Sequence, residues 1–284
     1  MASFNSKSVF AIAKKEFLDN IRNKWIIVLT ILLFLLVILF SYLAGRQSGG
    51  EDLLGDMQNT VFGLVGISSI LIPLIAIILG FGTISGEAES GALSVVLSYP
   101  VKRVEILFGK LIGLGSVIIV SILVGFGFGG ILITATVGSE SWLSYIAFIG
   151  LTIFLGFIYL SLSICISSFF KRRITSIGGG LLIFFWGMIV GSILMGVVFA
   201  SGFEMKDMMT GNFPEWYWYE TLFSPMDLHQ TTVTKAFGIE TIKYMDFSID
   251  MPEFLNIGLL LFTHLIWFIV PLILSYRFFK KRDI

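Results

Sequence analysis

The chain has 284 residues, of which 56% are hydrophobic, 15% aromatic and 13% charged, and its formal net charge is zero. An average soluble domain has roughly 25% charged residues, so this composition excludes a soluble enzyme, a disordered chain and a nucleic-acid-binding module. The mean hydropathy of +0.93 predicts a membrane protein instead.

Six apolar segments are each near or above the ~20 residues that a helix needs to cross a bilayer. In chain order they are Trp25 to Ala44, Val61 to Phe81, Ile106 to Thr134, Trp142 to Phe170, Ile174 to Ala200 and Phe254 to Phe279. The runs are too long and too little interrupted for barrel strands, which alternate over about 10 residues. We therefore expect an all-α polytopic membrane protein with six transmembrane helices, forming a single transmembrane domain over residues 1–284.

The charges of the connecting segments indicate an orientation. With the N-terminus inside, the inner segments hold fifteen of the nineteen Lys and Arg residues and six of the nineteen Asp and Glu residues. An excess of Lys and Arg marks the cytoplasmic side of a membrane protein. We expect a multi-pass protein of the plasma (inner) membrane with both termini in the cytosol.

Residues 1–24 predict an amphipathic helix at the membrane surface. Five apolar residues recur at spacings of three and four and form one stripe: Phe10, Ala13, Phe17, Ile21 and Trp25. Basic residues lie largely off this stripe, which is typical of a helix in the headgroup plane. Such a helix is either a simple anchor or an elbow that also contacts a cytosolic partner.

Two connections are large. The inner stretch 82–105 contains a predicted short helix, 90–98, with Ala92, Leu93, Val96 and Leu97 on one face. The outer stretch 201–253 is rich in aromatic residues, which suits a membrane–water interface. Short helices, either amphipathic or half-inserted, are expected around 215–238, with Pro214 and Pro225 as breakers.

Motifs for chemistry within the chain are missing from the sequence. There is no phosphate-binding G-x-x-x-x-G-K-[ST] loop, no H-E-x-x-H and no C-x-x-C, so we expect no catalytic residues and no metal site. Once Lys110 is counted with the preceding loop, the six segments contain no Asp, Glu, Lys or Arg in their interiors. Ion-coupled carriers usually need such residues. His264 is the one histidine there, and it either bonds a neighbouring helix or lines a pathway.

The chain resembles the ABC-2 type permeases, the membrane subunits of ATP-binding-cassette exporters, over its whole length. Three groups of residues carry the resemblance in the inner connection: Glu87, Gly91 and Leu93; Pro100 and Arg103; and Leu107, Gly109 and Lys110. A fourth is Ala13-Lys14-Lys15-Glu16-Phe17, followed by Arg22 and Lys24-Trp25. The chain is similar to permeases with a separate ATPase, such as that of the nitrous-oxide-reductase maturation system.

The resemblance implies roles for particular residues. Residues 86–105 would hold a coupling helix that docks on the ATPase, and the residues assigned to coupling are Glu87, Glu89, Gly91, Leu93, Leu97, Pro100 and Arg103. The elbow helix would use Lys14, Lys15, Glu16, Phe17 and Arg22. Substitution of Glu87 and Leu93 is expected to uncouple ATP hydrolysis from transport.

The resemblance also implies partners. They are two cytosolic ATPase subunits, which would hold ATP and Mg, and a second permease chain that is identical or related; no cofactor is expected in this chain and no nucleic acid as a partner. Two other functions stay open: an ion-coupled carrier or channel without an ATPase, and an anchored protein that binds an outer partner through 201–253.

Overall fold

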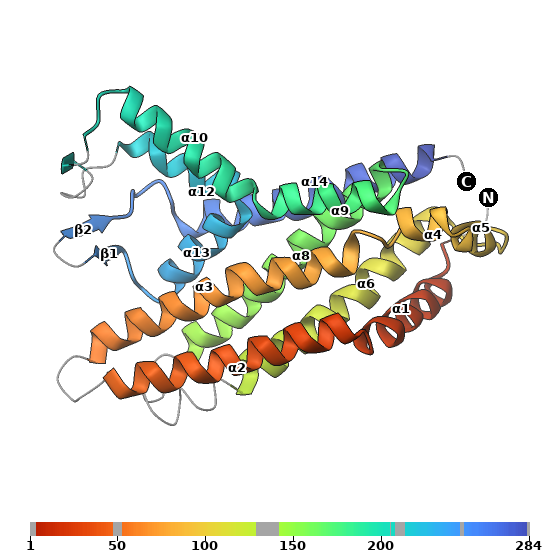
Figure 1. The fold of residues 1–284 in the computed structure, drawn as a ribbon, viewed down its shortest axis with the longest axis horizontal. Helices are drawn as coiled ribbons and strands as arrows, with labels where there is room; N and C mark the ends of the chain where they lie inside the picture. The colour runs from red at the N-terminus through yellow and green to blue at the C-terminus, as the bar shows by residue number, and fades with distance from the viewer. Residues whose placement is uncertain are drawn as a thin grey trace.

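The computed structural model describes residues 4–47, 53–128, 142–204, 206–207, 214–244 and 247–282. They form an elongated bundle whose long helices run roughly along one axis (Figure 1). The helix α1 (Ser6–Ile21) begins at the same end of the bundle at which α14 (Ile257–Lys281) ends. Sequence-distant segments therefore meet at this end.

The apolar segments all form helices in their described parts. The long ones are α2 (Lys24–Gln47), α3 (Leu53–Gly80), α6 (Arg103–Ile122), α8 (Trp142–Phe169), α9 (Arg173–Phe184), α10 (Trp186–Ala200) and α14. α6 continues into a π-helical turn, η1 (Leu123–Gly127), and the end of the third segment, from residue 129, lies outside the described residues. Four helices in the described part are long and apolar enough to cross a membrane, and the number rises to six if each of two bent pairs is one span.

Two pairs of consecutive helices are bent relative to each other. α1 and the following part of α2 meet at 69°, and α9 and α10 meet at 45°. Phe185 separates α9 from α10, and its φ and ψ of −84° and 0° interrupt the regular helix. The fifth segment is thus one apolar run in the sequence but two helices in the structure.

α8 is the centre of the bundle. It packs against α14, α3, α13 (Pro225–Ala236) and α6. Phe148, Leu155 and Tyr159 recur at helical spacing on its buried face. The core therefore sits between α8 and the helices around it.

The described part of residues 201–253 contains the short helices that the sequence predicts. η2 (Glu215–Tyr219) follows Pro214, α12 (Glu220–Phe223) comes next, and α13 begins at Pro225. α13 packs against α3, α8 and α14 and is therefore part of the helix bundle. The fold is all-helical as expected, apart from one short antiparallel strand pair among the described residues, β1 (Thr241–Tyr244) and β2 (Phe247–Asp250).

The predicted apolar stripe of α1 lies only partly on the face that packs against the protein. Val9, Ala13 and Glu16 are buried, whereas Phe10 is 72% exposed and Trp25 is 70% exposed. In a membrane protein, an apolar side chain is as stable in contact with lipid as in contact with protein, because lipid tails are as apolar as leucine. Ala13, Phe17 and Ile21 of the stripe therefore pack against the protein, whereas Phe10 and Trp25 point away from it.

Candidate functional site

The connection between α3 and α6 lies at the end of the bundle where α1 begins and α14 ends (Figure 1). It forms two short helices, α4 (Ser85–Glu89) and α5 (Ala92–Leu97). Gly91 joins them with a φ of 76°, a left-handed conformation that a residue with a Cβ adopts only under strain. Pro100 is exposed and ends the connection shortly before α6.

α5 has a buried and an exposed face. Leu93 is fully buried in the main core, and Leu97 packs against that core at the end of the helix. On the other face, Val95 is 61% exposed, and Tyr99, just after α5, is 65% exposed. Leu93 thus anchors the helix within its own chain, and the side chains available to a partner are Val95 and Tyr99.

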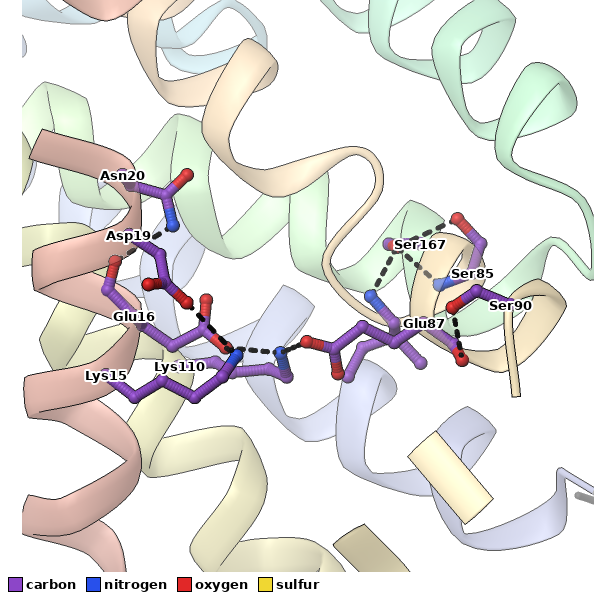
Figure 2. A network of polar contacts seen from close by, with 10 residues as sticks. Lys15, Glu16, Asp19, Asn20, Ser85, Glu87, Ser90, Lys110 and Ser167 are labelled. Atoms are coloured by element: carbon purple, nitrogen blue, oxygen red, sulfur yellow. Dashed lines mark hydrogen bonds and ion pairs between the residues drawn. The ribbon is translucent and has the colours of Figure 1, made fainter. Parts of the chain in front are cut away.

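A buried lysine links this connection to α1. Lys110 Nζ lies 2.7 Å from Glu16 Oε1 and 2.7 Å from Glu87 Oε1, and Figure 2 shows the lysine between the two carboxylates. The Lys110 side chain is 2% exposed, that of Glu16 is 8% exposed and that of Glu87 is 24% exposed. A buried charge is stable only when it is paired. The Glu16–Lys110–Glu87 triad therefore ties α1, α6 and α4 together.

The packing of α1 on α6 depends on two glycines one helical turn apart. A Cβ on Gly113 would lie 2.5 Å from the carbonyl oxygen of Ala13, and one on Gly109 would lie 2.7 Å from Ile12 Cβ. Both distances are shorter than real contacts allow, so these positions admit only glycine unless α1 moves. The resulting close approach places Glu16 within reach of Lys110.

Glu105 joins the starts of the same two helices. Its carboxylate accepts hydrogen bonds from the backbone N–H of Lys102, at 3.0 Å, and of Asn5, at 2.7 Å. Backbone N–H groups at a helix start have no partner within the helix, so an acidic side chain there is stabilising. Glu105 was not among the predicted site residues, although an acid in a first helical turn is a recognisable capping signal.

Two arginines bind the C-terminal ends of helices. Arg103 donates to the carbonyl oxygens of Phe279, Lys280 and Arg282, at 2.8 Å for Lys280 and 2.9 Å for Arg282, and its guanidinium lies over the Phe279 ring. Arg282 in turn donates to the carbonyls of Ser167, Phe170 and Lys171 at the end of α8. A cation at a helix C-terminus offsets the partial negative charge of the carbonyls. Arg103 therefore fixes the end of α14 to the start of α6.

The start of α9 is attached to α4 by polar contacts. Glu89 accepts a hydrogen bond from the backbone N–H of Arg173 at 2.9 Å. Ser167 Oγ on α8 accepts from the backbone N–H of Ser85 at 3.0 Å, and Ser176 Oγ on α9 donates to Ser85 Oγ at 3.0 Å. A movement of α4 would therefore act on α8 and α9 as well as on α6.

The other predicted residues of α1 lie around this site without joining the triad directly. Lys14 and Arg22 are exposed, and Phe17 is half-buried against the core. Lys15 lies 3.4 Å from Asp19 and 3.8 Å from Glu16 on the exposed side of the helix. Glu16 is thus the one member of the predicted elbow set that contacts the α3–α6 connection.

His264 lies far along the chain from this site, inside the bundle. Its side chain is fully buried and stacks on Phe154 of α8 with ring centroids 5.7 Å apart. Its Nδ1 lies 2.8 Å from the carbonyl oxygen of Leu260 on its own helix. In this conformation His264 contacts α8 and α14, and lining of a pathway stays a prediction.

The chain is similar to known proteins over nearly its whole length. A family model described as ABC-2 family transporter protein matches residues 10–284. The chain belongs to this family. The permease is 27% identical over 282 residues to the probable ABC transporter permease protein NosY of Stutzerimonas stutzeri, covering 96% of the permease and 98% of that relative. It is also 27% identical over 282 residues to the protein of the same name from Pseudomonas aeruginosa, covering 97% and 99% respectively.

The permease is therefore the membrane-spanning subunit of an ABC transporter, and it is an integral membrane protein rather than an enzyme in itself. Membership of the family implies an ATPase subunit and a second permease chain as partners.

The triad is the feature that sequence reasoning missed. Its signal was Lys110, a lysine four residues inside the third apolar segment, which requires a buried counter-charge.

Proposed function

We propose that the permease exports its substrate across the inner membrane, powered by a separate cytosolic ATPase. Two permease chains, identical or related, would pair around a central path, with two ATPase subunits below them. Both termini and the α4–α5 connection would face the cytosol, and ATP and Mg would bind in the partner subunits. Export is the direction that the resemblance to ABC-2 exporters favours.

In this proposal the α4–α5 connection couples ATP hydrolysis in the ATPase to movement of the spans. The Glu16–Lys110–Glu87 triad is the observation that supports this role best. α4 and α5 leave the bundle between two spans, yet Lys110 binds α4 to α1 and to the interior of α6. A segment that served only as a loop would need no buried charge, because burial of a charge has a large desolvation cost. Val95 and Tyr99 supply exposed apolar surface on the side away from the bundle.

A cleft beside α5 supports the same role. It has a volume of about 630 Å³ and lies between the α4–α5 connection and the ends of α8 and α14. Glu89 and Ser94 line one side, and Lys171, Lys281 and Arg282 line the other. Its mixed charges suit a polar protein surface, and Val95 and Tyr99 would provide the apolar part of the contact.

The proposed mechanism transmits force through short contacts. Closure of the ATPases on ATP would push on α5, whose Leu93 is fixed in the core. α4 would move with it, and Glu87 would pull on Lys110 and thereby on α6 and α1. Arg103 would carry the same movement to the end of α14. The spans would tilt together because each is joined to the connection by a buried or charged contact.

The first test is to isolate the tagged permease from its own membranes in mild detergent and to identify its partners by mass spectrometry. A stoichiometric partner with a phosphate-binding G-x-x-x-x-G-K-[ST] loop is the expected result. A preparation free of ATPase in several detergents would contradict the proposal and favour an ion-coupled carrier.

The second test separates docking from packing. Val95→Asp and Tyr99→Asp should reduce ATPase binding without lowering the melting temperature of the permease, because both side chains are exposed. Leu93→Ala is a poor probe of docking, since truncation of a buried leucine costs about 2–5 kcal/mol of folding stability. Glu87→Gln should preserve ATPase binding and reduce ATP-dependent transport, which separates transmission from docking.

A further inference from the structure

A groove lies along α1, between α1 and the exposed side of α6. It has a volume of about 860 Å³, within the ~300–1,000 Å³ range of ligand pockets. Val9 and Ala13 of α1 and Phe108 and Ile112 of α6 line it. All four are apolar, so this part of the groove offers hydrophobic surface.

Two aromatic residues extend this apolar surface. Phe4 and Phe10 also line the groove, and they are 55% and 72% exposed. Phe108 and Ile112, one helical turn apart on α6, are 42% and 48% exposed. Exposed apolar surface of this kind requires an apolar occupant.

Two lysines at the same groove supply positive charge. Lys7 and Lys14 both line it, and their spacing of seven residues places them on one face of α1, two turns apart. Both are exposed, and neither forms an ion pair within the part of the chain that the structure describes. The neighbouring Lys15 differs, because it is paired with Asp19 and Glu16.

We propose that this groove is a binding site for an anionic glycerophospholipid, with an acyl chain along Val9, Ala13 and Phe108 and the phosphate between Lys7 and Lys14. The charge complementarity decides the occupant. A neutral lipid would satisfy the apolar groove but leave both lysines without a counter-charge, and an acidic protein segment would satisfy the lysines but not the groove. The proposal rests on the proposed cytoplasmic position of α1, where basic residues meet the anionic leaflet.

The site has a consequence for the permease because of what lies behind it. Ala13 lines the groove and also presses its carbonyl oxygen against Gly113 of α6. Glu16, one turn further on, belongs to the triad with Lys110. A lipid in the groove would hold α1 against α6 and so would support the connection between α1 and α4.

The test measures lipid retention by the full-length permease. The protein is purified from detergent loaded with equal amounts of phosphatidylglycerol and phosphatidylcholine, and the retained lipids are counted by native mass spectrometry. We expect an excess of phosphatidylglycerol in the wild type. Lys7→Gln with Lys14→Gln should reduce this excess by roughly five-fold for each lysine, and Lys15→Gln should leave it unchanged.

A second variant tests the groove independently of charge. Ala11→Trp fills it from an exposed position on α1 and should reduce retention of both lipids. The proposal is overturned if the double glutamine variant keeps the full phosphatidylglycerol excess, or if Lys15→Gln reduces it equally. It is also overturned if the double variant loses the ATPase subunit and not the lipid, because the lysines would then bind protein.

The position of α1 is tested separately. Ser6→Cys, in a Cys165→Ala background, should react with a membrane-impermeant thiol reagent from the cytoplasmic side. Reaction from the outer side would contradict the proposed orientation while the lipid count still decides the binding site.

Discussion

Lys110 and Glu87 form a 2.7 Å ion pair between the inner part of α6 and the short helix α4, which the chain reaches before α6 begins. Glu16 completes the pairing from the other side at the same distance. The lysine thus meets two carboxylates, one from the N-terminal helix and one from the inner connection.

Loss of Lys110 alone should lower the folding stability more than loss of all three charges of the triad. Lys110→Met leaves Glu16 and Glu87 close together without a cation, and loss of one partner of a buried ion pair costs about 3–5 kcal/mol. Since Glu87 is partly exposed, the lower end of this range is expected. Thermal unfolding in detergent should show a clearly lower melting temperature.

The control is a triple variant, Glu16→Gln, Glu87→Gln and Lys110→Met, which contains no charge at the site. It should recover most of the stability that the single variant loses. If the single Lys110→Met variant had the same melting temperature as the wild type, the triad would contribute nothing to folding stability.

Gly113→Ala should loosen α1. The new Cβ would lie 2.5 Å from Ala13 O, so α1 must move away from α6, and overpacking of this kind costs typically ~1–3 kcal/mol. Gly66→Ala in α3 is the matched control, since nothing lies within 4 Å of its Cβ. Alanine in a free helical position instead stabilises by roughly 0.5–1 kcal/mol. Hydrogen exchange of α1 should rise in the first variant only, and equal exchange in both would refute the close packing.

Arg103→Gln should release the end of α14. The variant loses charged hydrogen bonds to three carbonyls and the contact with the Phe279 ring, at a cost of about 1–3 kcal/mol. Faster hydrogen exchange is expected in the last turn of α14, with little change in α1. Arg22→Gln, an exposed arginine at the end of α1, should have no such effect. Unchanged exchange in α14 would show that Arg103 is not needed there.

Acidification should strengthen the packing of α12 and α13 against α10. Burial raises the pKa of Asp227, against the opposing hydrogen bond from Ser224, and burial likewise raises the pKa of Glu220. A raised pKa means that the folded protein favours the protonated acid. The stabilisation is therefore complete below the unfolded pKa and is lost as the pH rises through the folded pKa.

Both acids face α10, where Gly187 and Gly191 leave room for them. Melting temperature should therefore increase as the pH falls from neutral towards the normal pKa of these acids, and Asp227→Asn should weaken this dependence. Asp250→Asn is the control in the hairpin. A variant that keeps the full pH dependence would exclude Asp227 as its source.

His264→Phe should preserve folding and ATP-dependent transport. The ring stacks on Phe154, and its Nε2 has no hydrogen-bond partner among the described residues, so phenylalanine keeps the packing and removes an unsatisfied polar atom. Transport in proteoliposomes and thermal unfolding are measured together. Loss of transport by a stable variant would show instead that His264 lines the pathway.

The sequence predicted the helices well and the bends and contacts between them poorly. Length and hydropathy determine where a chain can cross a bilayer, so all six apolar segments proved helical where they are described. The 45° bend at Phe185 has no proline to signal it. On α1, Phe10 is exposed and Glu16 is buried, the reverse of a soluble helix, because lipid accepts apolar residues and protein supplies partners for charged ones.

The candidate site was predicted in its parts and not in its arrangement. Glu16 and Glu87 were assigned by the resemblance to two separate elements, the elbow and the coupling helix. Their shared contact with Lys110 depends on the close approach of α1 to Gly109 and Gly113. Local spacing carries no information about such long-range contacts, although it did predict the face of α5 on which Leu93, Val96 and Leu97 pack against the core and from which Val95 is absent.

The order of the triad along the chain also bears on how the protein is made. Glu16 precedes Lys110 by 94 residues, which a ribosome adds in about 5–19 seconds at the usual rate. Both acids have therefore been synthesised before the lysine emerges. The counter-charges Glu16 and Glu87 are thus already present when α6 enters the bilayer. Lys110, the only buried cation among the described residues, therefore need not enter lipid as an unpaired charge.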